Sequence, residues 1–224
     1  ERLSQRDLKE VIRWEAKDYL PFSVEDCTID FDPQRKFIVE EDGIRRLLVR
    51  IAAVTNEVAT KHIFLLNKAG ITPALITAIP FVLTELIKRC SLIKKDELVA
   101  IIDIGKSKTD ITIFKGENIE FNRGIPLAGD EINLFLTVAL TVEGKPLKLN
   151  LTQAESVKKR WGIPLSEDRD FRIEEGFSIA ELLSMIRPAV ERLSNEIKRS
   201  FEFYQRYLKG GKVSVFVLAL TSAP

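Results

Sequence analysis

The stretch VAIIDIGKSKTD (residues 99–110) decides the fold of this chain. An apolar run of Val, Ala and Ile ends at Asp103, and the short loop after it carries Gly105 and two lysines. A second apolar run (111–114) follows directly, so the pattern predicts a β-hairpin whose first strand is buried. Gly105 lets the backbone approach a ligand closely, and successive loop N–H groups can bind a phosphate.

The polar residues of this loop predict a phosphate site with a nearby metal ion. Lys106 and Lys108 add positive charge. Phosphate repels Asp103, but this carboxylate can hold Mg²⁺ through water, because Mg²⁺ prefers oxygen ligands and keeps much of its hydration shell. An ordinary hairpin with a polar turn fits the same residues, because short glycine motifs also match by chance. The rest of the chain has to decide between the two.

Composition allows one large domain or two small ones in 224 residues. Lys+Arg 34 against Asp+Glu 33 leaves a net charge of +1, which gives no general attraction to nucleic acid or anionic lipid. Basic runs such as Lys94-Lys95 and Lys158-Lys159-Arg160 are expected to be solvated faces. No apolar run approaches the roughly 18 residues that a membrane helix needs.

The titratable residues predict no catalytic centre. The two cysteines, Cys27 and Cys90, have no metal or redox spacing, which favours a reducing cytoplasmic compartment. His62 is the only histidine, so the chain offers no Ser/His/Asp or Cys/His arrangement without it.

The periodicity predicts alternating helices and strands. In the first third we expect helices over 4–19 and 55–70, strands over 24–31, 45–53 and 71–78, and a helix that opens at Pro80. Beyond it we expect a meander of strands (99–104, 111–114, 119–123), helices over 129–140 and 152–161, and a buried strand over 213–220. Pro188 is expected to split or kink the helical pattern of residues 178–207.

Five motifs carry a family resemblance. In chain order they are WEAKDYLPFSVEDCTIDF (14–31), NKAGITPALITAIPFVL (67–83), VAIIDIGKSKTDITIF (99–114), RGIPLAGDEIN (123–133) and EIKRSFEFYQ (196–205). The last three resemble the second lobe of the actin-like ATPase fold. All five together resemble the PilM family of actin-like type IV pilus assembly proteins, relatives of the cell-division protein FtsA.

The resemblance implies an α/β fold of the actin-like (ribonuclease H-like) ATPase class, with mixed sheets flanked by helices. It also implies a small inserted α+β subdomain in the first lobe, at residues 1–78. Residues 79–95 would form a connecting helix of that lobe, and 96–224 the second lobe, with a smaller variable subdomain at 141–178.

The resemblance also implies half of a site for ATP and Mg²⁺. The implied nucleotide residues are Asp103 (which also holds Mg²⁺ through water), Gly105, Lys106, Ser107, Thr109, Gly129, Lys198 and Arg199. The first five lie in the second phosphate loop, Gly129 approaches the nucleotide, and the last two flank the adenosine. At Gly129 we expect a helix start with unpaired N–H groups.

Three departures from the family pattern argue for weak or absent ATPase activity. The family's other phosphate loop lies on an N-terminal hairpin, and this chain starts after it. Ser222 and Ala223 stand where the family has a Gly-Gly turn beside adenine. Pro80 stands where hydrolysing members place a Gln or an acid that positions water.

The resemblance implies that the protein is a cytoplasmic assembly component of type IV pilus biogenesis, located at the inner face of the inner membrane. The partner would be the cytoplasmic tail of a PilN-like inner-membrane protein, which alone brings the chain to the membrane. This tail would bind as an extended peptide on Phe22, Val24, Ile29 and Phe31, with Leu47 and Val49 across the sheet. The same side chains could instead form an ordinary core.

Two other functions stay open. One is an ATPase of the FtsA or actin type that hydrolyses nucleotide and forms filaments; rings and filaments are common in this fold. The other is a nucleotide-free scaffold of type II secretion resembling the cytoplasmic domain of GspL. In the preferred interpretation, ATP holds the lobes together and tunes docking.

Overall fold

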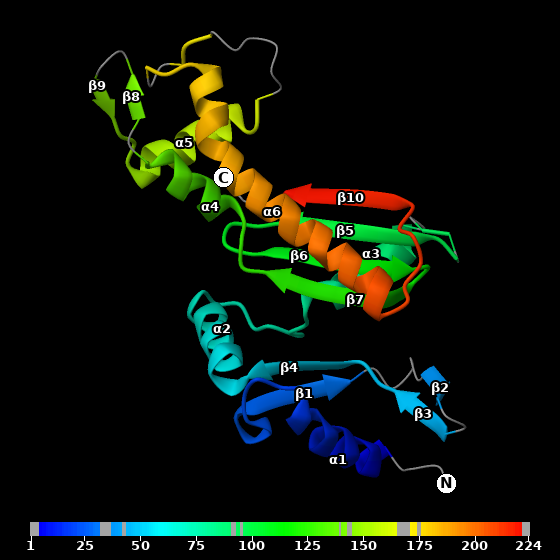
Figure 1. Ribbon diagram of the computed structural model, residues 1–224. Coiled ribbons are helices and arrows are strands. Elements are labelled where there is room, and N and C mark those ends of the chain that lie inside the picture. The colour runs from blue at the N-terminus through cyan, green and yellow to red at the C-terminus, as the bar shows by residue number, and fades with distance from the viewer. Residues whose placement is uncertain are drawn as a thin grey trace. The chain divides into compact units, whose positions relative to one another are not determined.

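The computed structural model divides the chain into two compact units, Glu1–Val82 and Leu83–Pro224 (Figure 1). The structure describes residues 5–31, 37–41, 44–90, 93–94, 96–138, 140–142, 145–164, 171–173 and 176–220. The two units are described separately below.

The first unit is a small α+β assembly. Its helices are α1 (Gln5–Glu15) and α2 (Asn56–Lys68), and its strands are β1 (Cys27–Phe31), β2 (Phe37–Glu41), β3 (Ile44–Leu48) and β4 (Ile51–Thr55). Strand β1 pairs antiparallel with β4, and β2 pairs antiparallel with β3. A small core of Ala16, Val24 and Cys27 lies beside the first of these pairs.

Local chemistry corrects three strand predictions in this unit. Residues 24–26 form a 3₁₀ turn whose N-cap is Ser23, so the strand predicted over 24–31 begins at Cys27. The strand predicted over 45–53 is interrupted at residues 49–50 and becomes β3 and β4. Residues 71–78 form no strand, which agrees with the missing N–H of Pro73.

The second unit is built on a mixed four-stranded sheet. It contains β5 (Leu98–Ile104), β6 (Thr109–Lys115), β7 (Asn118–Ile125) and β10 (Val215–Leu220), in the order β10-β5-β6-β7. Strand β10 is parallel to β5, whereas β5, β6 and β7 form the predicted antiparallel meander. Helix α3 (Ile79–Cys90) precedes the sheet in sequence, and α6 (Ile179–Tyr207) runs across one of its faces (Figure 1).

Strand β10 is an edge strand, and the prediction that it is buried is wrong. Val215, Phe216, Val217 and Leu218 are all exposed. Strand order explains this exposure, because within the described residues β10 pairs only with β5. The apolar sequence alone cannot distinguish an edge position from a central one.

The sequence predicts two helices or a kink at Pro188; helix α6 is continuous through this residue, so the division into two helices is wrong. A proline inside a helix costs about 3 kcal/mol because it removes a backbone hydrogen bond and crowds the preceding turn. Buried Ile186 and Ala189 flank this exposed proline. Their packing on both sides offsets the cost.

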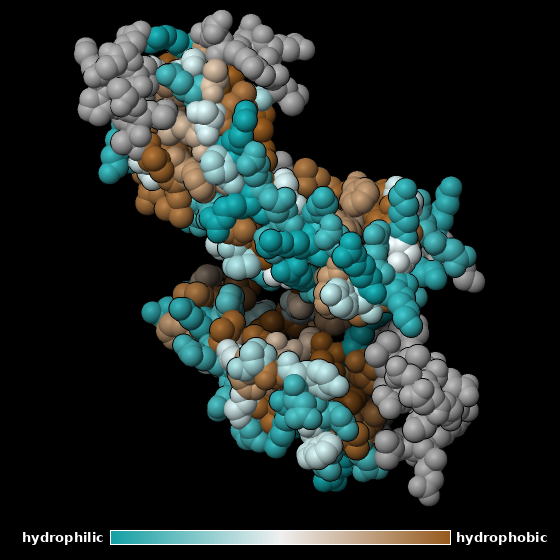
Figure 2. Space-filling model, in the orientation of Figure 1, coloured by the Kyte–Doolittle hydropathy of each residue, from teal (hydrophilic) through white to brown (hydrophobic). Residues whose placement is uncertain are grey.

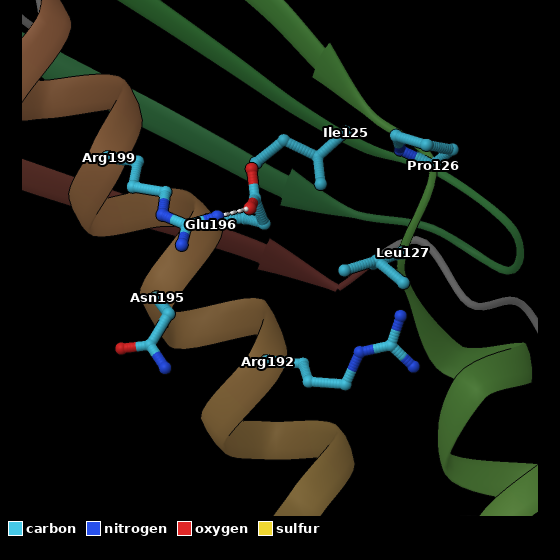
Figure 3. A pocket seen from close by; sticks show the side chains of 7 residues that line it. All are labelled: Ile125, Pro126, Leu127, Arg192, Asn195, Glu196 and Arg199. Atoms are coloured by element: carbon cyan, nitrogen blue, oxygen red, sulfur yellow. Dashed lines mark hydrogen bonds and ion pairs between the residues drawn. The ribbon is translucent and has the colours of Figure 1, made fainter.

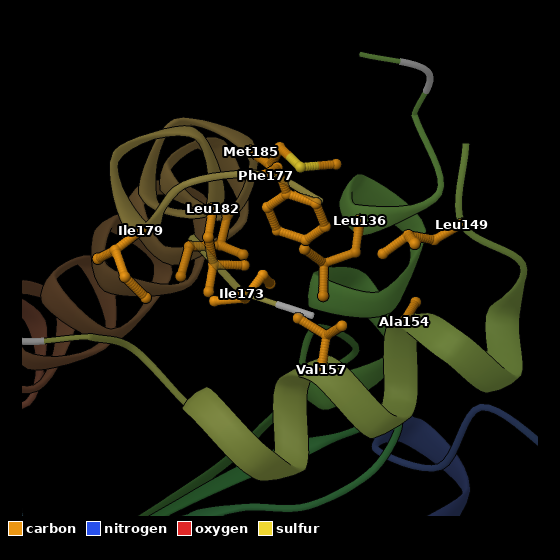
Figure 4. Close-up of a cluster of buried hydrophobic side chains, with 10 residues drawn as sticks. Leu136, Leu149, Ala154, Val157, Ile173, Phe177, Ile179, Leu182 and Met185 are labelled. Carbon is orange, nitrogen blue, oxygen red and sulfur yellow. The ribbon is translucent and has the colours of Figure 1, made fainter. Parts of the chain in front are cut away.

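A second core lies away from the sheet in the same unit (Figure 4). It joins α4 (Gly129–Leu136), α5 (Leu151–Trp161) and the start of α6, around Phe177 and Leu182. Capping boxes at Asn150 and Ser178 define where α5 and α6 begin. Helix α4 ends earlier than predicted, and the short strands β8 (Leu140–Val142) and β9 (Lys145–Leu147) follow it.

Candidate functional site

The loop between β5 and β6 is short and internally braced. The Gly105 N–H donates to the carbonyl of Lys108 at 3.0 Å. Among the described residues, no backbone carbonyl accepts a hydrogen bond from the amides of Lys106 or Ser107. Both residues are exposed, so these two amides remain available to an anion.

The loop is joined to the start of α4 by two backbone hydrogen bonds. The Gly129 N–H donates to the Gly105 carbonyl at 3.1 Å, and the Asp130 N–H donates to the Lys106 carbonyl at 2.7 Å. The structure therefore brings Gly105 and Gly129 together, although they are far apart in sequence. A Cβ at Gly129 would lie 3.4 Å from the Gly105 oxygen, an ordinary contact, and 3.1 Å from Nζ of Lys158, so Lys158 rather than the loop limits the space at this position.

These bonds correct the expectation that α4 begins with unpaired N–H groups. The amides of Gly129 and Asp130 already have acceptors in the loop, and the amide of Glu131 donates to the Ala128 carbonyl at 3.1 Å. At other helix starts, a capping side chain or an anion accepts hydrogen bonds from the first N–H groups. Here the loop carbonyls accept them. Any anion at this place must be bound by the loop amides and by side chains.

Thr109 acts as an internal anchor of this region. Its side chain is buried, and its hydroxyl donates to the Leu127 carbonyl at 2.7 Å. This bond ties the start of β6 to the segment that leads into α4. The structure thus gives Thr109 a partner within the protein.

The two carboxylates that flank the loop lie opposite each other in the sheet. Asp103 and Asp110 are partners in the β5–β6 register. Like charges in this position repel, and the Lys108 ammonium, 2.7 Å from Asp110, offsets the repulsion. A Cβ on Gly124 would come 2.3 Å from Cε of Lys108, so a side chain at position 124 would displace the flexible end of this lysine from its place beside Asp110.

A polar cluster beside Gly129 was not predicted from the sequence. The Lys158 ammonium of α5 lies 2.6 Å from Glu155 and 3.4 Å from the Gly129 carbonyl. Its side chain is only 11% exposed, so the expectation of a solvated Lys158 is wrong. One signal was present: Lys158 follows the buried residues Ala154 and Val157 at helical spacing.

Glu155 links this lysine to α4. Its carboxylate accepts hydrogen bonds from the Lys158 ammonium and from the side-chain NH₂ group of Asn133. The Lys158 hydrogen bond is the main cause that holds the pKa of Glu155 below its ordinary value of 4.5, and burial opposes it. The side-chain oxygen Oδ1 of Asn133 is buried and accepts no hydrogen bond from the described residues.

The other two predicted nucleotide residues lie on α6, outside the β5–β6 loop. Lys198 and Arg199 lie exposed on α6, and Arg199 pairs with Glu196 at 2.6 Å. Arg199 lines a cavity with residues 125–127, whereas Lys198 does not. Neither Gly129 nor any residue of 103–109 lines that cavity.

The predicted peptide residues lie in the first unit, around its small core. Val24 is only 3% exposed, while Phe22 and Ile29 are partly buried against it. Phe31 is half-buried and pairs with Ile51 of β4. The expectation that Leu47 and Val49 lie across the sheet is wrong, because β1 pairs with β4.

The described residues hold no group of three or more His, Cys, Asp or Glu side chains that could bind a metal directly. A magnesium ion here would depend on its own waters and on Asp103. Among the same residues, every helix is too short or too polar to cross a bilayer.

Comparisons with known proteins agree with this architecture. A family model described as "Type IV pilus assembly protein PilM" matches residues 1–144. A solved "PilM-PilN type IV pilus biogenesis complex" is similar with a TM-score of 0.74 and 24% identity, over 99% of this chain and 57% of that chain. MreB 5 of Spiroplasma citri bound to AMPPNP is similar with a TM-score of 0.52 and 17% identity, over 75% of this chain and 60% of that one. No curated protein sequence matches.

The fold therefore places the protein in the actin-like α/β class, as predicted. The family model covers 144 of the 224 residues. The chain belongs to the PilM family of type IV pilus assembly proteins, which confirms the family predicted from the motifs. It spans 57% of the PilM–PilN structure's matched chain and 60% of the MreB chain.

The polar cluster predicts a pH-dependent stability difference. Because folding lowers the pKa of Glu155, its ionised carboxylate contributes fully to the free energy of unfolding above pH 4.5. This contribution is lost as the pH falls through the pKa of the folded state. Glu155→Gln should therefore lower the urea midpoint at neutral pH, and the difference from wild type should shrink as the pH is lowered below 4.5. Urea unfolding followed by circular dichroism measures both midpoints.

The matched control is Glu191→Gln, which changes an exposed glutamate on α6. It should leave the midpoint unchanged at both pH values. An equal loss of stability in Glu155→Gln at acid and neutral pH would contradict the assigned ion pair.

Proposed function

We propose that the protein serves in type IV pilus assembly by binding a nucleotide and the tail of a PilN-like protein. Family membership supports the pilus role. The observation that carries the nucleotide half is the joined β5–β6 loop and α4 start, which sets exposed loop amides beside Gly129. ATP bound here would act as a clamp that tunes docking.

The residues at the loop fit part of a phosphate site. The amides of Lys106 and Ser107 would donate to phosphate oxygens, because the amides of α4 are already used. The side chain of Lys106 is exposed and would add charge. Lys158 would supply a second cation, held next to Gly129 by Glu155.

Asp103 would hold Mg²⁺ through water at the end of β5. Mg²⁺ bridges phosphate oxygens and neutralises their charge. It would also reduce the repulsion between the opposed carboxylates of Asp103 and Asp110. Gly105 and Thr109 would hold the loop in shape from its two ends.

We assign weak or no hydrolysis to this protein. Pro80 has no group that can position a water molecule. The predicted departure at Ser222 and Ala223 lies outside the described residues. Lys198 and Arg199 remain proposed neighbours of the adenosine.

A nucleotide-free scaffold is the second candidate function. One observation favours it: the amides at the start of α4 have acceptors inside the protein and need no anion. The titration described below separates the two functions.

The second part of the proposal, the binding of a PilN-like tail, concerns the first unit. An extended PilN-like tail would pack on the half-buried side chains of Phe22, Ile29 and Phe31, with Val24 as the core beneath them. The similar solved structure is a PilM–PilN complex, which supports this type of partner. We propose that this tail brings a cytoplasmic protein to the inner face of the inner membrane.

Asp103→Ala tests the nucleotide site. Calorimetry should show Mg-ATP affinity reduced about tenfold or more, equivalent to about 1.4 kcal/mol, while ATP without Mg²⁺ should bind the variant at least as tightly as wild type, because the repulsive carboxylate is gone. The fold should survive, because the change removes a repulsive carboxylate opposite Asp110.

The control Asp96→Ala removes an exposed carboxylate just before β5 and should bind Mg-ATP as wild type does. Unchanged affinity in Asp103→Ala would reject the metal assignment. No binding of Mg-ATP to wild type would favour the scaffold.

Ile29→Asp tests the peptide site. Ile29 and Thr28 are neighbours on β1, but Ile29 is half-buried and Thr28 is exposed. In a pull-down with the PilN tail peptide, Ile29→Asp should lose binding because a charge enters the apolar face, whereas Thr28→Asp should bind.

Circular dichroism checks folding in both variants. If Ile29→Asp unfolds the first unit, Phe31→Ala becomes the deciding variant, and it should weaken peptide binding about tenfold. Wild-type binding by a folded Ile29→Asp, or by Phe31→Ala, would reject the peptide site.

A further inference from the structure

A cavity of about 570 Å³ lies between α6 and the turn that joins β7 to α4 (Figure 3). We call it the α6 groove. It lies within the second unit, and its lining residues are Ile125, Pro126, Leu127, Arg192, Asn195, Glu196 and Arg199. It shares no residue with the β5–β6 loop.

Partly buried glutamates hold the arginines of the α6 groove in place. The two carboxylate oxygens of Glu196 accept from Arg199 at 2.6 Å and from Arg123 at 3.1 Å. Arg192 pairs with Glu131 of α4. Because each glutamate is mostly buried, it fixes its arginine from the protein side.

The guanidinium groups remain open to solvent. The Arg192 side chain is 57% exposed and that of Arg199 is 70% exposed. A guanidinium has five N–H donors, and within the described residues each of these two arginines donates one side-chain hydrogen bond. The remaining donors are oriented and available, which lowers the entropic cost of binding an anion.

The α6 groove combines a positive rim with an apolar wall. Among the lining residues, two guanidinium groups (Arg192, Arg199) stand with one carboxylate (Glu196), which leaves one positive charge in excess. Across the groove stand Ile125, Pro126 and Leu127 (Figure 3). The outer surface over α6 is largely hydrophilic (Figure 2).

We propose that the α6 groove docks an acidic, extended segment of a partner protein. Arg192 and Arg199 are seven residues apart on one helix, so their Cα atoms are separated by about 10 Å along its axis. Residues three apart in a polyproline II segment lie on the same side and about 9 Å apart. Two such carboxylates can reach both arginines while an apolar residue between them packs on Leu127.

The geometry favours a peptide over a single phosphate group. Arg192 and Arg199 are held by glutamates on different elements, one on α4 and the other on α6. They therefore present two separated anchoring points. The apolar wall adds a contact that an inorganic anion cannot use.

The probe is the peptide Gly-Glu-Leu-Pro-Glu-Gly, and its control is Gly-Gln-Leu-Pro-Gln-Gly. NMR titration of the full chain should show shifts at Ile125, Leu127 and Arg199 with the acidic peptide. The variant Arg192→Gln/Arg199→Gln should weaken that binding about tenfold or more. Arg187→Gln, which changes an exposed arginine outside the groove, should bind as wild type does.

Circular dichroism checks folding, and Arg199→Lys keeps the charge while it removes the planar fork, so it should bind with intermediate affinity. Equal binding of the acidic peptide by wild type and the folded double variant would overturn the proposal. So would equal binding of the two peptides, or shifts of the same groove residues with inorganic phosphate as strong as those with the acidic peptide. None of these outcomes bears on Asp103 or on Ile29, whereas Arg199 is also a proposed neighbour of the adenosine.

Discussion

Two backbone hydrogen bonds hold the candidate nucleotide site of this protein together. They run from the first amides of α4 to the carbonyls of Gly105 and Lys106. Without them, the β5–β6 loop would be an ordinary hairpin turn and Gly129 would start an unrelated helix. With them, loop and helix form one rigid corner, and the exposed loop amides have a fixed direction.

Other interactions in the second unit converge on this corner. Thr109 ties β6 to the segment before α4, and Lys158 brings α5 to the Gly129 carbonyl. The core around Leu182 in turn fixes α5 against α4 and α6. Glu155 and Lys158 thus connect α5 to the Gly129 carbonyl at the start of α4.

The sequence predicted what depends on local pattern. The meander and the turn at Gly105 follow from the local residue pattern, whereas the nearness of Gly129 to this loop was expected only from the family resemblance. It could not predict what depends on tertiary partners. Lys158 looks like part of a solvated basic run until α4 lies beside it, and β10 looks buried until strand order makes it an edge.

Amide hydrogen exchange tests the central claim most directly, because it reports on the two bonds themselves. In the free chain, the amides of Gly129 and Asp130 should exchange slowly, whereas those of Lys106 and Ser107 should exchange quickly. Fast exchange at Gly129 and Asp130 in the folded protein would contradict the account, because loop and helix would not be joined.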